Sequence, residues 1–357
     1  MKKYTVGIVG ATGMVGQRFV TLLSGHPWFE IGALAASKGS SGKTYAQAVE
    51  GRWAMSSKMP ENIADIEVLD ASDVDKVASG VDFIFCAVDM SKDETQALEE
   101  AYAKAECPVV SNNSAHRGTP DVPMMMPEVN FAHSQIIHSQ RKRLGTKRGF
   151  IAVKPNCSIQ GYVPLLDALR EFEAQKVLAC TYQAISGAGK TFDTWPEMRD
   201  NLIPHISGEE QKSEMEPLKI WGEIKGGVIV PAALPLITTQ CFRVPVSDGH
   251  TAAVFASFAK KPGIDEIKSL WNNYRGEPQK LGLPSAPKKL IHYFEEENRP
   301  QARLDRDLEN GMAVSAGRLR GDSQYDIKFA CLSHNTIRGA AGGAVLTGEL
   351  LCAQGLI

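Results

Sequence analysis

Residues 4–24 read Tyr4-Thr-Val-Gly-Ile-Val-Gly-Ala-Thr-Gly-Met-Val-Gly-Gln-Arg-Phe-Val-Thr-Leu-Leu-Ser24, and this stretch gives the strongest indication of the fold class. The apolar run Tyr4–Val9 predicts a buried strand. Apolar residues at helical spacing over 14–24 predict a helix, which should end at the following Gly25-His-Pro27. A strand joined to a helix by a short glycine-rich loop is the first unit of a parallel α/β sheet.

The glycines of this loop have separate predicted tasks. Gly10 permits a tight turn, Gly13 lets the backbone approach a pyrophosphate at the helix N-terminus, and Gly16 allows the helix to pack on the strand. A glycine pattern alone also fits a tight turn without a ligand, but its position at the first strand–helix unit favours dinucleotide binding. The predicted cofactor contacts in the loop are Gly10, Thr12, Gly13, Met14 and Val15.

The end of the second predicted strand, Glu30–Ala36, indicates which dinucleotide is bound. An NAD site favours an acidic residue there, because a carboxylate binds the ribose hydroxyls. This chain instead has hydroxyls and a cation, which suit a ribose 2′-phosphate, so we expect NADP. The residues concerned are Ser37, Lys38, Ser40 and Ser41.

The remaining chain predicts two domains. Further short apolar runs (81–88, 108–111 and 150–153) alternate with helical stretches, which is typical of a parallel sheet. After residue 157 the pattern changes to a helix over 158–172 and longer alternating runs at 177–185, 227–234, 251–259, 312–318 and 325–332. The predicted fold class is α/β: a Rossmann-type doubly wound parallel sheet plus an α+β domain with a mixed, largely antiparallel sheet. We expect domains at 1–155 and 156–335, with the C-terminal helix 336–357 returning to the first.

Bulk composition excludes several kinds of protein. With a net charge of −2, the 357-residue chain gives no reason to expect nucleic acid or an anionic membrane as a partner. No apolar run reaches the ~18 residues of a membrane span, and the N-terminus has no signal-peptide pattern. Seven cysteines without a C-x-x-C pair fit reduced thiols and argue against a zinc site, so we expect a cytoplasmic protein without metal.

One cysteine, Cys157 in Pro155-Asn-Cys-Ser158, lies between a predicted strand and a predicted helix. At a helix N-terminus the dipole and free N–H groups would stabilise a thiolate, and the same groups could stabilise an oxyanion. A free cysteine is more often a small buried apolar residue, which is our interpretation of Cys86, Cys180 and Cys331. His250 follows a glycine turn and precedes a strand, so it is the candidate base.

The chain resembles the archaeal and fungal branch of the aspartate-semialdehyde dehydrogenase family over its whole length. Together and in order, the matching segments are specific. Besides the glycine loop they are Ser111-Asn-Asn-Ser-Ala-His-Arg117, Pro155-Asn-Cys-Ser158, Tyr182-Gln-Ala-Ile-Ser-Gly-Ala-Gly189, Gly208-Glu-Glu-Gln-Lys212, Glu216-Pro-Leu-Lys-Ile220, Arg243–His250 and His334-Asn-Thr-Ile-Arg-Gly-Ala-Ala341.

The resemblance implies a catalytic role for four residues and a substrate-binding role for another four. Cys157 would be the nucleophile, His250 the acid/base, and Gln183 would orient the reacting group, with Asn156 beside the thiol. Arg243 would bind the substrate carboxylate, Glu209 the amino group, and Arg117 and Lys212 the phosphate. Ser186, Gly187 and Asn335 would lie along the cofactor. Taken alone, Arg117, Glu209 and Lys212 fit a solvated charged face equally well.

The implied reaction is the NADPH-dependent reductive dephosphorylation of L-4-aspartyl phosphate to L-aspartate 4-semialdehyde through a thioester on Cys157. It belongs to biosynthesis of lysine, threonine, methionine and isoleucine. The resemblance also implies a homodimer or homotetramer, with the mixed sheet as the contact. The segment after the thiol, Ser158-Ile-Gln-Gly-Tyr162, departs from the usual Ser-Thr or Thr-Val, so we expect different packing of the helix behind it.

Other functions remain open to different degrees. Malonyl-CoA or succinyl-CoA reductases share most of these motifs, but a substrate without an amino group has no need of Glu209. N-acetyl-glutamyl-phosphate reductases would have Gly-Cys-Tyr-Pro at the thiol. Short-chain dehydrogenases need a tyrosine with a lysine four residues later, which no tyrosine here has. A non-catalytic NADP-binding sensor would not need Cys157.

Overall fold

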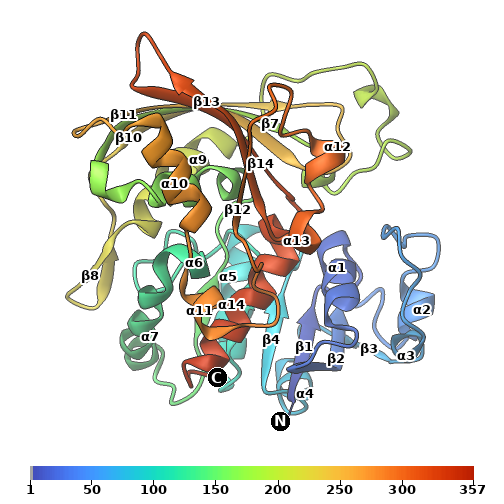
Figure 1. Ribbon diagram of the computed structural model, residues 1–357. Helices are drawn as coiled ribbons and strands as arrows, with labels where there is room; N and C mark the ends of the chain where they lie inside the picture. The colour runs from blue at the N-terminus through green and yellow to red at the C-terminus, as the bar shows by residue number, and fades with distance from the viewer. Residues whose placement is uncertain (1–2) are drawn as a thin grey trace.

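A computed structural model describes residues 3–357, and Figure 1 shows two lobes, each built on one sheet. The lower lobe holds a six-stranded parallel sheet in the order β3-β2-β1-β4-β5-β6. Its strands are β1 (Tyr4–Val9), β2 (Phe29–Ala36), β3 (Val68–Asp70), β4 (Phe83–Cys86), β5 (Val109–Ser111) and β6 (Ile151–Val153). This strand order reverses direction at β1, as in doubly wound dinucleotide-binding sheets.

Helices surround this first sheet. They are α1 (Met14–Leu23), α2 (Tyr45–Ala48), α3 (Glu61–Ala64), α4 (Val74–Ala78), α5 (Lys92–Lys104), α6 (Pro127–Asn130), the 3-10 helix η1 (Phe131–Ile136) and α7 (Ile137–Leu144). The strands are nearly all apolar and buried, because helices cover both sheet faces.

The upper lobe holds a mixed sheet in the order β10-β7-β11-β14-β13-β12. The three central pairs are antiparallel, and the outer pairs β10·β7 and β12·β13 are parallel. The strands are β7 (Ala174–Gln183), β10 (Leu236–Arg243), β11 (His250–Phe258), β12 (Ile291–Phe294), β13 (Val314–Gly321) and β14 (Ile327–Ser333). The predicted fold class is therefore confirmed.

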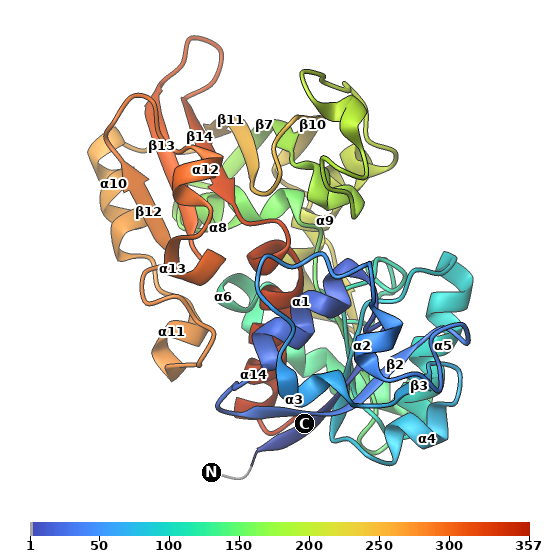
Figure 2. The ribbon, with the colours of Figure 1, turned by 90° about the vertical axis from the view of Figure 1, so that its right-hand side faces the viewer.

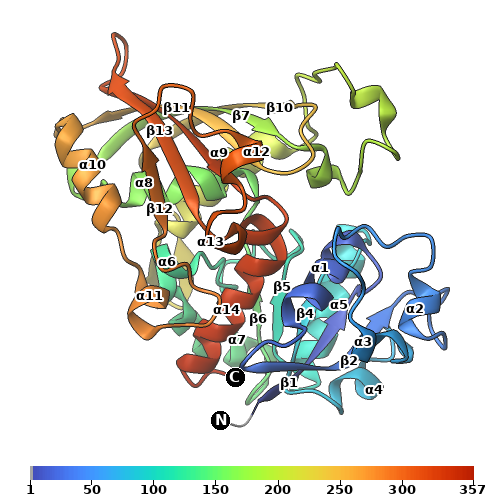
Figure 3. The same ribbon diagram turned by 45° about the vertical axis from the view of Figure 1, so that its right-hand side comes forward.

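The helices within residues 158–311 are short except for two. They are η2 (Ser158–Gly161), α8 (Val163–Asp167), η3 (Arg170–Phe172), η4 (Ile185–Ala188), η5 (Pro196–Met198), α9 (Glu209–Ile220), α10 (Ile264–Asn273), α11 (Glu277–Leu281), α12 (Ala302–Asp305) and α13 (Leu308–Gly311). The segment between β7 and α9 extends above α1 in Figures 1 and 3.

The chain ends in the π-turn η6 (Ile337–Ala341) and α14 (Gly342–Ala353). Figure 2 shows α14 lying against the first sheet, near the N-terminal strand β1. Gly348 explains the close contact, because an added Cβ would lie 3.2 Å from the Phe85 ring. The helix is buried almost all round, so it belongs to the core between the lobes.

Three predictions about elements were wrong. The single helix over 158–172 is three short pieces, since Pro164 starts α8 and Gly161 packs tightly, with an added Cβ only 3.3 Å from Cys331 Sγ. The run 227–234 gives only β9 (Val228–Val230), which pairs with β8 (Glu223–Lys225) outside the main sheet. The helix predicted from Thr336 begins instead with the π-turn. Strands β3, β8, β10 and β12 were not predicted.

Within residues 3–357 no helix combines the length and apolarity needed to cross a bilayer. In the same range no three His, Cys, Asp or Glu side chains are grouped to hold a metal ion.

Candidate active site

Cys157 lies in a turn at the carboxyl end of β6, where the first sheet meets the second lobe. Lys154 continues the sheet by donating its N–H to Ser111 O at 2.8 Å. The residues after Cys157 form only the one-turn helix η2. A helix dipole of useful length is therefore missing behind the sulfur, and this expectation was wrong.

The backbone amides beside Cys157 are already hydrogen-bonded. Asn156 N donates to Glu216 Oε2 at 2.6 Å, and Ser158 N donates to Asn156 Oδ1 at 2.7 Å. Neither N–H group is free to stabilise an oxyanion. The prediction that backbone N–H groups beside the thiol do so is therefore wrong for Asn156 and Ser158. Their bonds instead hold the turn in one shape.

Helix α9 fixes this turn from the other side. Glu209 accepts both bonds from Asn156 Nδ2 at 3.0 Å, and Ser213 Oγ lies 2.8 Å from Ser158 Oγ. Pro217 lacks the N–H that would bond to Ser213 O within the helix. The buried Tyr162 hydroxyl donates to that carbonyl at 2.9 Å, so the defect in α9 ties the helix to the segment after the thiol.

Strand pairing in the second sheet brings the other predicted catalytic residues to one edge. Gln183 and Arg243 end the parallel strands β7 and β10 and are register partners. His250 begins the antiparallel strand β11, so it lies at the same edge. His250 Nε2 is 3.4 Å from Cys157 Sγ.

One backbone hydrogen bond fixes the state of the His250 ring. Ala184 N donates to His250 Nδ1 at 3.1 Å, so Nδ1 is the acceptor and carries no proton. In neutral imidazole the proton then sits on Nε2, which faces the sulfur. Burial holds the pKa of His250 well below its usual value, and nearby Arg243, His334 and Lys154 lower that pKa further. The ring is therefore neutral and donates towards Cys157.

The thiol is also neutral in this environment. Burial, with a smaller contribution from Glu209, raises the pKa of Cys157 to about 11. Lys154, Arg117 and Arg243 oppose this rise because their charges favour a thiolate. Burial also lowers the pKa of Lys154 to about 7, so its charge is weaker than those of the two arginines. The site thus holds a protonated thiol rather than a thiolate–imidazolium pair.

A cavity of about 240 Å³ opens over the sulfur between the lobes. Its lining includes the predicted residues Val15, Arg117, Asn156, Cys157, Ser186, Gly187, Glu209, Lys212 and Asn335. Glu209 and Lys212 form an ion pair at 3.0 Å, and Glu209 also accepts from Gln183 Nε2 at 3.4 Å. Charges of both signs therefore converge on one partly desolvated space.

Arg243 and His250 lie directly behind Gly187 at the cavity wall. A Cβ added at Gly187 would be 2.8 Å from Arg243 Nη1 and 3.1 Å from His250 Cε1. A side chain at position 187 would therefore crowd these two groups at the cavity wall. Arg243 Nη1 also donates to Ala184 O at 2.7 Å, which orients the guanidinium.

The glycine loop has the geometry expected of a phosphate-binding turn. Gly10 has a φ of +91°, and an added Cβ would be 2.3 Å from Ala87 O, so no other residue fits. At Gly16 an added Cβ would be 2.2 Å from Gly10 O, which explains the close packing of α1. The α1 N-terminus has no side-chain cap and no acidic residue in its first turn, so it suits an anion.

The predicted NADP-selecting residues lie at the carboxyl end of β2, outside the thiol cavity. Ser37 and Lys38 are exposed, whereas Ser40 is only 6% exposed and faces inward. A second cavity of about 360 Å³ adjoins the first through Ser186 and includes Met14. Asn335 Nδ2 donates to Ser186 Oγ at 2.8 Å, which fixes Ser186 between the two cavities.

Several residues at the site were not predicted. Asn112, Ser114, Thr336, Gly339 and Ala340 line the thiol cavity, and all lie inside motifs that the sequence made recognisable. Glu216 and Ser213 do not line it but hold the residues that do. Only the spacing of Glu209, Ser213 and Glu216 along one helix face could have indicated them.

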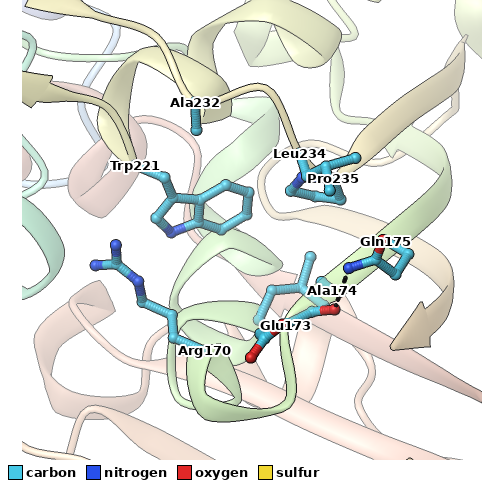
Figure 4. A pocket seen from close by; sticks show the side chains of 9 residues that line it. Arg170, Glu173, Ala174, Gln175, Trp221, Ala232, Leu234 and Pro235 are labelled. Carbon is cyan, nitrogen blue, oxygen red and sulfur yellow. Dashed lines mark hydrogen bonds between the residues drawn. The ribbon is translucent and has the colours of Figure 1, made fainter. Parts of the chain in front are cut away.

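Another pocket, of about 280 Å³, lies in the second lobe away from the sulfur (Figure 4). Trp221, Leu234 and Pro235 form much of its wall, with Arg170 and Glu173 at the exposed rim. It contains no thiol or histidine among its lining residues.

Comparison with known proteins agrees with this geometry. Residues 5–137 match the model "Semialdehyde dehydrogenase, NAD binding domain", and residues 163–338 match "Semialdehyde dehydrogenase, dimerisation domain". The aspartate-semialdehyde dehydrogenase of Methanothermobacter thermautotrophicus is 43% identical, covering 97% of this chain and 98% of the relative. That of Schizosaccharomyces pombe is 42% identical and covers 99% of both.

The chain belongs to the aspartate-semialdehyde dehydrogenase family. A crystal structure of the Candida albicans aspartate-semialdehyde dehydrogenase with NADP superimposes with a TM-score of 0.90 at 39% identity and covers 100% of both chains. The predicted family and the prediction of an oxidoreductase with a nicotinamide dinucleotide-binding domain are confirmed.

Proposed function

We propose that this protein converts L-4-aspartyl phosphate to L-aspartate 4-semialdehyde with NADPH, through a thioester on Cys157. The observation that carries the proposal is the cavity in which Cys157, paired with His250 at 3.4 Å, faces Arg117, Lys212 and Glu209. An acyl phosphate with an amino group presents a phosphate to the cations and an ammonium to the carboxylate. Membership of the aspartate-semialdehyde dehydrogenase family supports the same substrate.

The cofactor assignment rests on residues that fit NADP(H). Gly10, Thr12, Gly13, Met14 and Val15 would hold the pyrophosphate at the open N-terminus of α1. The end of β2 carries Ser37 and Lys38 rather than an acid, which suits the 2′-phosphate, with Ser40 and Ser41 in the same turn. Ser186, Gly187 and Asn335 would lie along the nicotinamide half.

In the first chemical step the thiol proton of Cys157 passes to the phosphate group and the sulfur attacks the acyl carbon. The bond from that carbon to the phosphate oxygen breaks, and hydrogen phosphate leaves with the electron pair. Arg117 and Lys212 would bind that phosphate, and Arg243 would bind the α-carboxylate with its guanidinium fork. Bound NADPH supplies the hydride that reduces the thioester carbon. The sulfur–carbon bond then breaks, its electrons return to sulfur, and the semialdehyde leaves.

The hydrogen bond from Ala184 supports a specific role for His250. Because Nδ1 accepts that bond, the Nε2–H can donate to sulfur whenever the thiolate is formed, both before attack and after the sulfur–carbon bond breaks. To act as a base, the ring would first have to give up the Ala184 bond. We therefore assign His250 as a donor that stabilises the sulfur anion, while Gln183 and Asn156 hold Glu209 and the turn.

The match to a dimerisation domain supports a homo-oligomer. We propose the outer face of the second sheet as the contact between subunits of a dimer or tetramer. Tyr182 is 36% exposed and Leu236 61% exposed, and the Tyr182 and Phe242 rings stack with centroids 5.7 Å apart. The expected domain limits near residues 155 and 335 and the cytoplasmic location stay predictions.

The test is the reverse assay with purified protein, L-aspartate semialdehyde, inorganic phosphate and NADP⁺. We expect reduction of NADP⁺ that requires phosphate and disappears in Cys157→Ser. Oxidation of NADPH by malonyl-CoA or succinyl-CoA, without activity on the semialdehyde, would make the protein an acyl-CoA reductase. NADP⁺ binding without either activity would make it a sensor.

A further inference from the structure

Glu216 is a buried carboxylate that joins two parts of the site without lining the cavity. It is 6% exposed. Its Oε1 accepts from Arg117 Nη1 at 3.0 Å, and its Oε2 accepts from Asn156 N at 2.6 Å. One side chain therefore links the cavity arginine to the turn that carries the nucleophile.

We propose that Glu216 is a positioning residue that fixes Arg117 for phosphate at a set place relative to Cys157. This inference rests on the proposed function, in which Arg117 binds the phosphate group. A phosphate that leaves the acyl carbon must stay close to the sulfur in both directions of the reaction. Small displacements of a binding group are costly in such reactions, because rate depends steeply on the position of the reacting atoms.

The remaining contacts of Arg117 agree with a fixed guanidinium. Its Nε donates to Lys154 O at 3.0 Å, and its Nη2 donates to Asn112 O at 3.4 Å. With the Glu216 bond, each guanidinium nitrogen has one partner in the protein, and each terminal nitrogen keeps one N–H for a ligand. The side chain is thus held in one orientation before phosphate arrives.

Helix α9 connects this clamp to the second phosphate-binding residue. Glu216 lies one turn after Lys212 on the same face of the helix. Three residues further along, Lys219 Nζ donates to Arg117 O at 2.8 Å and to Thr119 O at 2.7 Å. Helix α9 therefore carries Lys212 and also fixes Arg117. It bonds the Arg117 side chain through Glu216 and the Arg117 backbone carbonyl through Lys219.

The variant Glu216→Asp tests this directly, because it keeps the charge but shortens the side chain by one methylene. The shorter carboxylate cannot reach both Arg117 and Asn156 N. In the reverse assay we expect the KM for inorganic phosphate to rise by about tenfold or more, while the KM for L-aspartate semialdehyde changes by less than about threefold.

Glu214→Asp is the matched control. Glu214 lies on the same helix and also bonds a backbone amide, Thr239 N at 2.9 Å, but on the second sheet rather than at the site. We expect both of its KM values to equal those of the wild type. A purely structural role for Glu216 would lower the melting temperature of Glu216→Asp and leave its KM for phosphate unchanged, which would overturn the proposal.

If Glu216→Asp does not fold, Glu216→Gln replaces it, since it keeps the length of the side chain. If Glu216 positions Arg117, this variant should displace the guanidinium and raise the KM for phosphate. A lowered KM would mean that Glu216 acts only by repelling the anion, and it would overturn the inference. Wild-type protein without any phosphate-dependent turnover would refute the proposed function itself. Wild-type turnover with an unchanged Glu216→Asp variant would refute the inference alone.

Discussion

Two cavities of similar volume differ in almost every chemical respect. The thiol cavity, of about 240 Å³, lies between the lobes, and the distal pocket, of about 280 Å³, lies within the second lobe. Around the first, Glu209 bonds to Lys212 and Asn156. At the second, Arg170 is exposed and forms a long ion pair with Asp167 at 3.5 Å.

Cavity volume alone therefore does not identify this active site. The thiol cavity brings together titratable groups from distant parts of the chain, and burial moves the pKa of Cys157 up and that of His250 down. Shifts of this kind cluster at functional sites, because the same desolvation strengthens electrostatic interactions with a substrate. The distal pocket is as large as the thiol cavity, but it does not bring together titratable groups of this kind.

Replacing Cys157 by serine should have the largest effect, since a serine hydroxyl is not ionised here and cannot form the thioester. We expect kcat to fall by about 10⁴-fold or more, measured as phosphate-dependent reduction of NADP⁺. Binding of NADPH, followed by its fluorescence, should persist. Residual turnover within tenfold of the wild type would remove the thiol from the mechanism.

Variants of His250 distinguish a donor from a base. For His250→Ala we expect kcat to fall by about 10²–10³-fold, the usual loss when a donor to a developing anion is removed. His250→Gln keeps an N–H donor and should recover at least about tenfold of that loss. A base cannot be replaced by an amide, so equal activity of the two variants would contradict the donor role.

Alkylation of Cys157 by iodoacetamide should depend strongly on pH. Reaction requires the thiolate, and because the pKa of this thiol is raised to about 11, the thiolate fraction rises with pH throughout the neutral range. We expect the rate to increase about tenfold per pH unit from pH 7 to 9, whereas an ordinary thiol levels off near pH ~8.5. A constant rate across this range would indicate a preformed thiolate. Peptide mass spectrometry identifies the modified residue, and glutathione serves as the reference.

The smallest effect should come from the distal pocket. Arg170→Ala removes an exposed side chain and one long ion pair, so we expect kcat/KM to be unchanged and the free energy of unfolding to change by less than about 1 kcal/mol. A substantial loss of activity would mean that the distal pocket influences the thiol cavity. It would contradict the distinction drawn between the two cavities.

The first lobe was largely predictable from the sequence because its signals are local. The glycine loop, the strand before Cys157 and the change of pattern after it each lie within a few residues. The apolar strands follow from burial on both sheet faces. Local motifs likewise indicate Cys157 among the seven cysteines, because it lies just beyond a predicted strand rather than inside one.

The spacing of residues along the sequence did not predict which side chains meet at the site, because that depends on pairing between distant strands. Gln183, Arg243 and His250 meet only through the registers of β7, β10 and β11. Family resemblance supplied their roles, but it did not indicate the Ala184 bond to His250 or the Glu216 clamp. The broken helix after the thiol and the short strand β12 also depend on tertiary packing, which local periodicity does not record.

Direct detection of the acyl-enzyme is the measurement that tests the central claim. The protein is mixed with L-aspartate semialdehyde and NADP⁺ without phosphate, and the peptides are analysed by mass spectrometry under acidic conditions. We predict an aspartyl adduct on the peptide containing Cys157 that disappears when inorganic phosphate is added. An enzyme that turns over with phosphate but never carries the adduct on Cys157 would contradict the thioester mechanism.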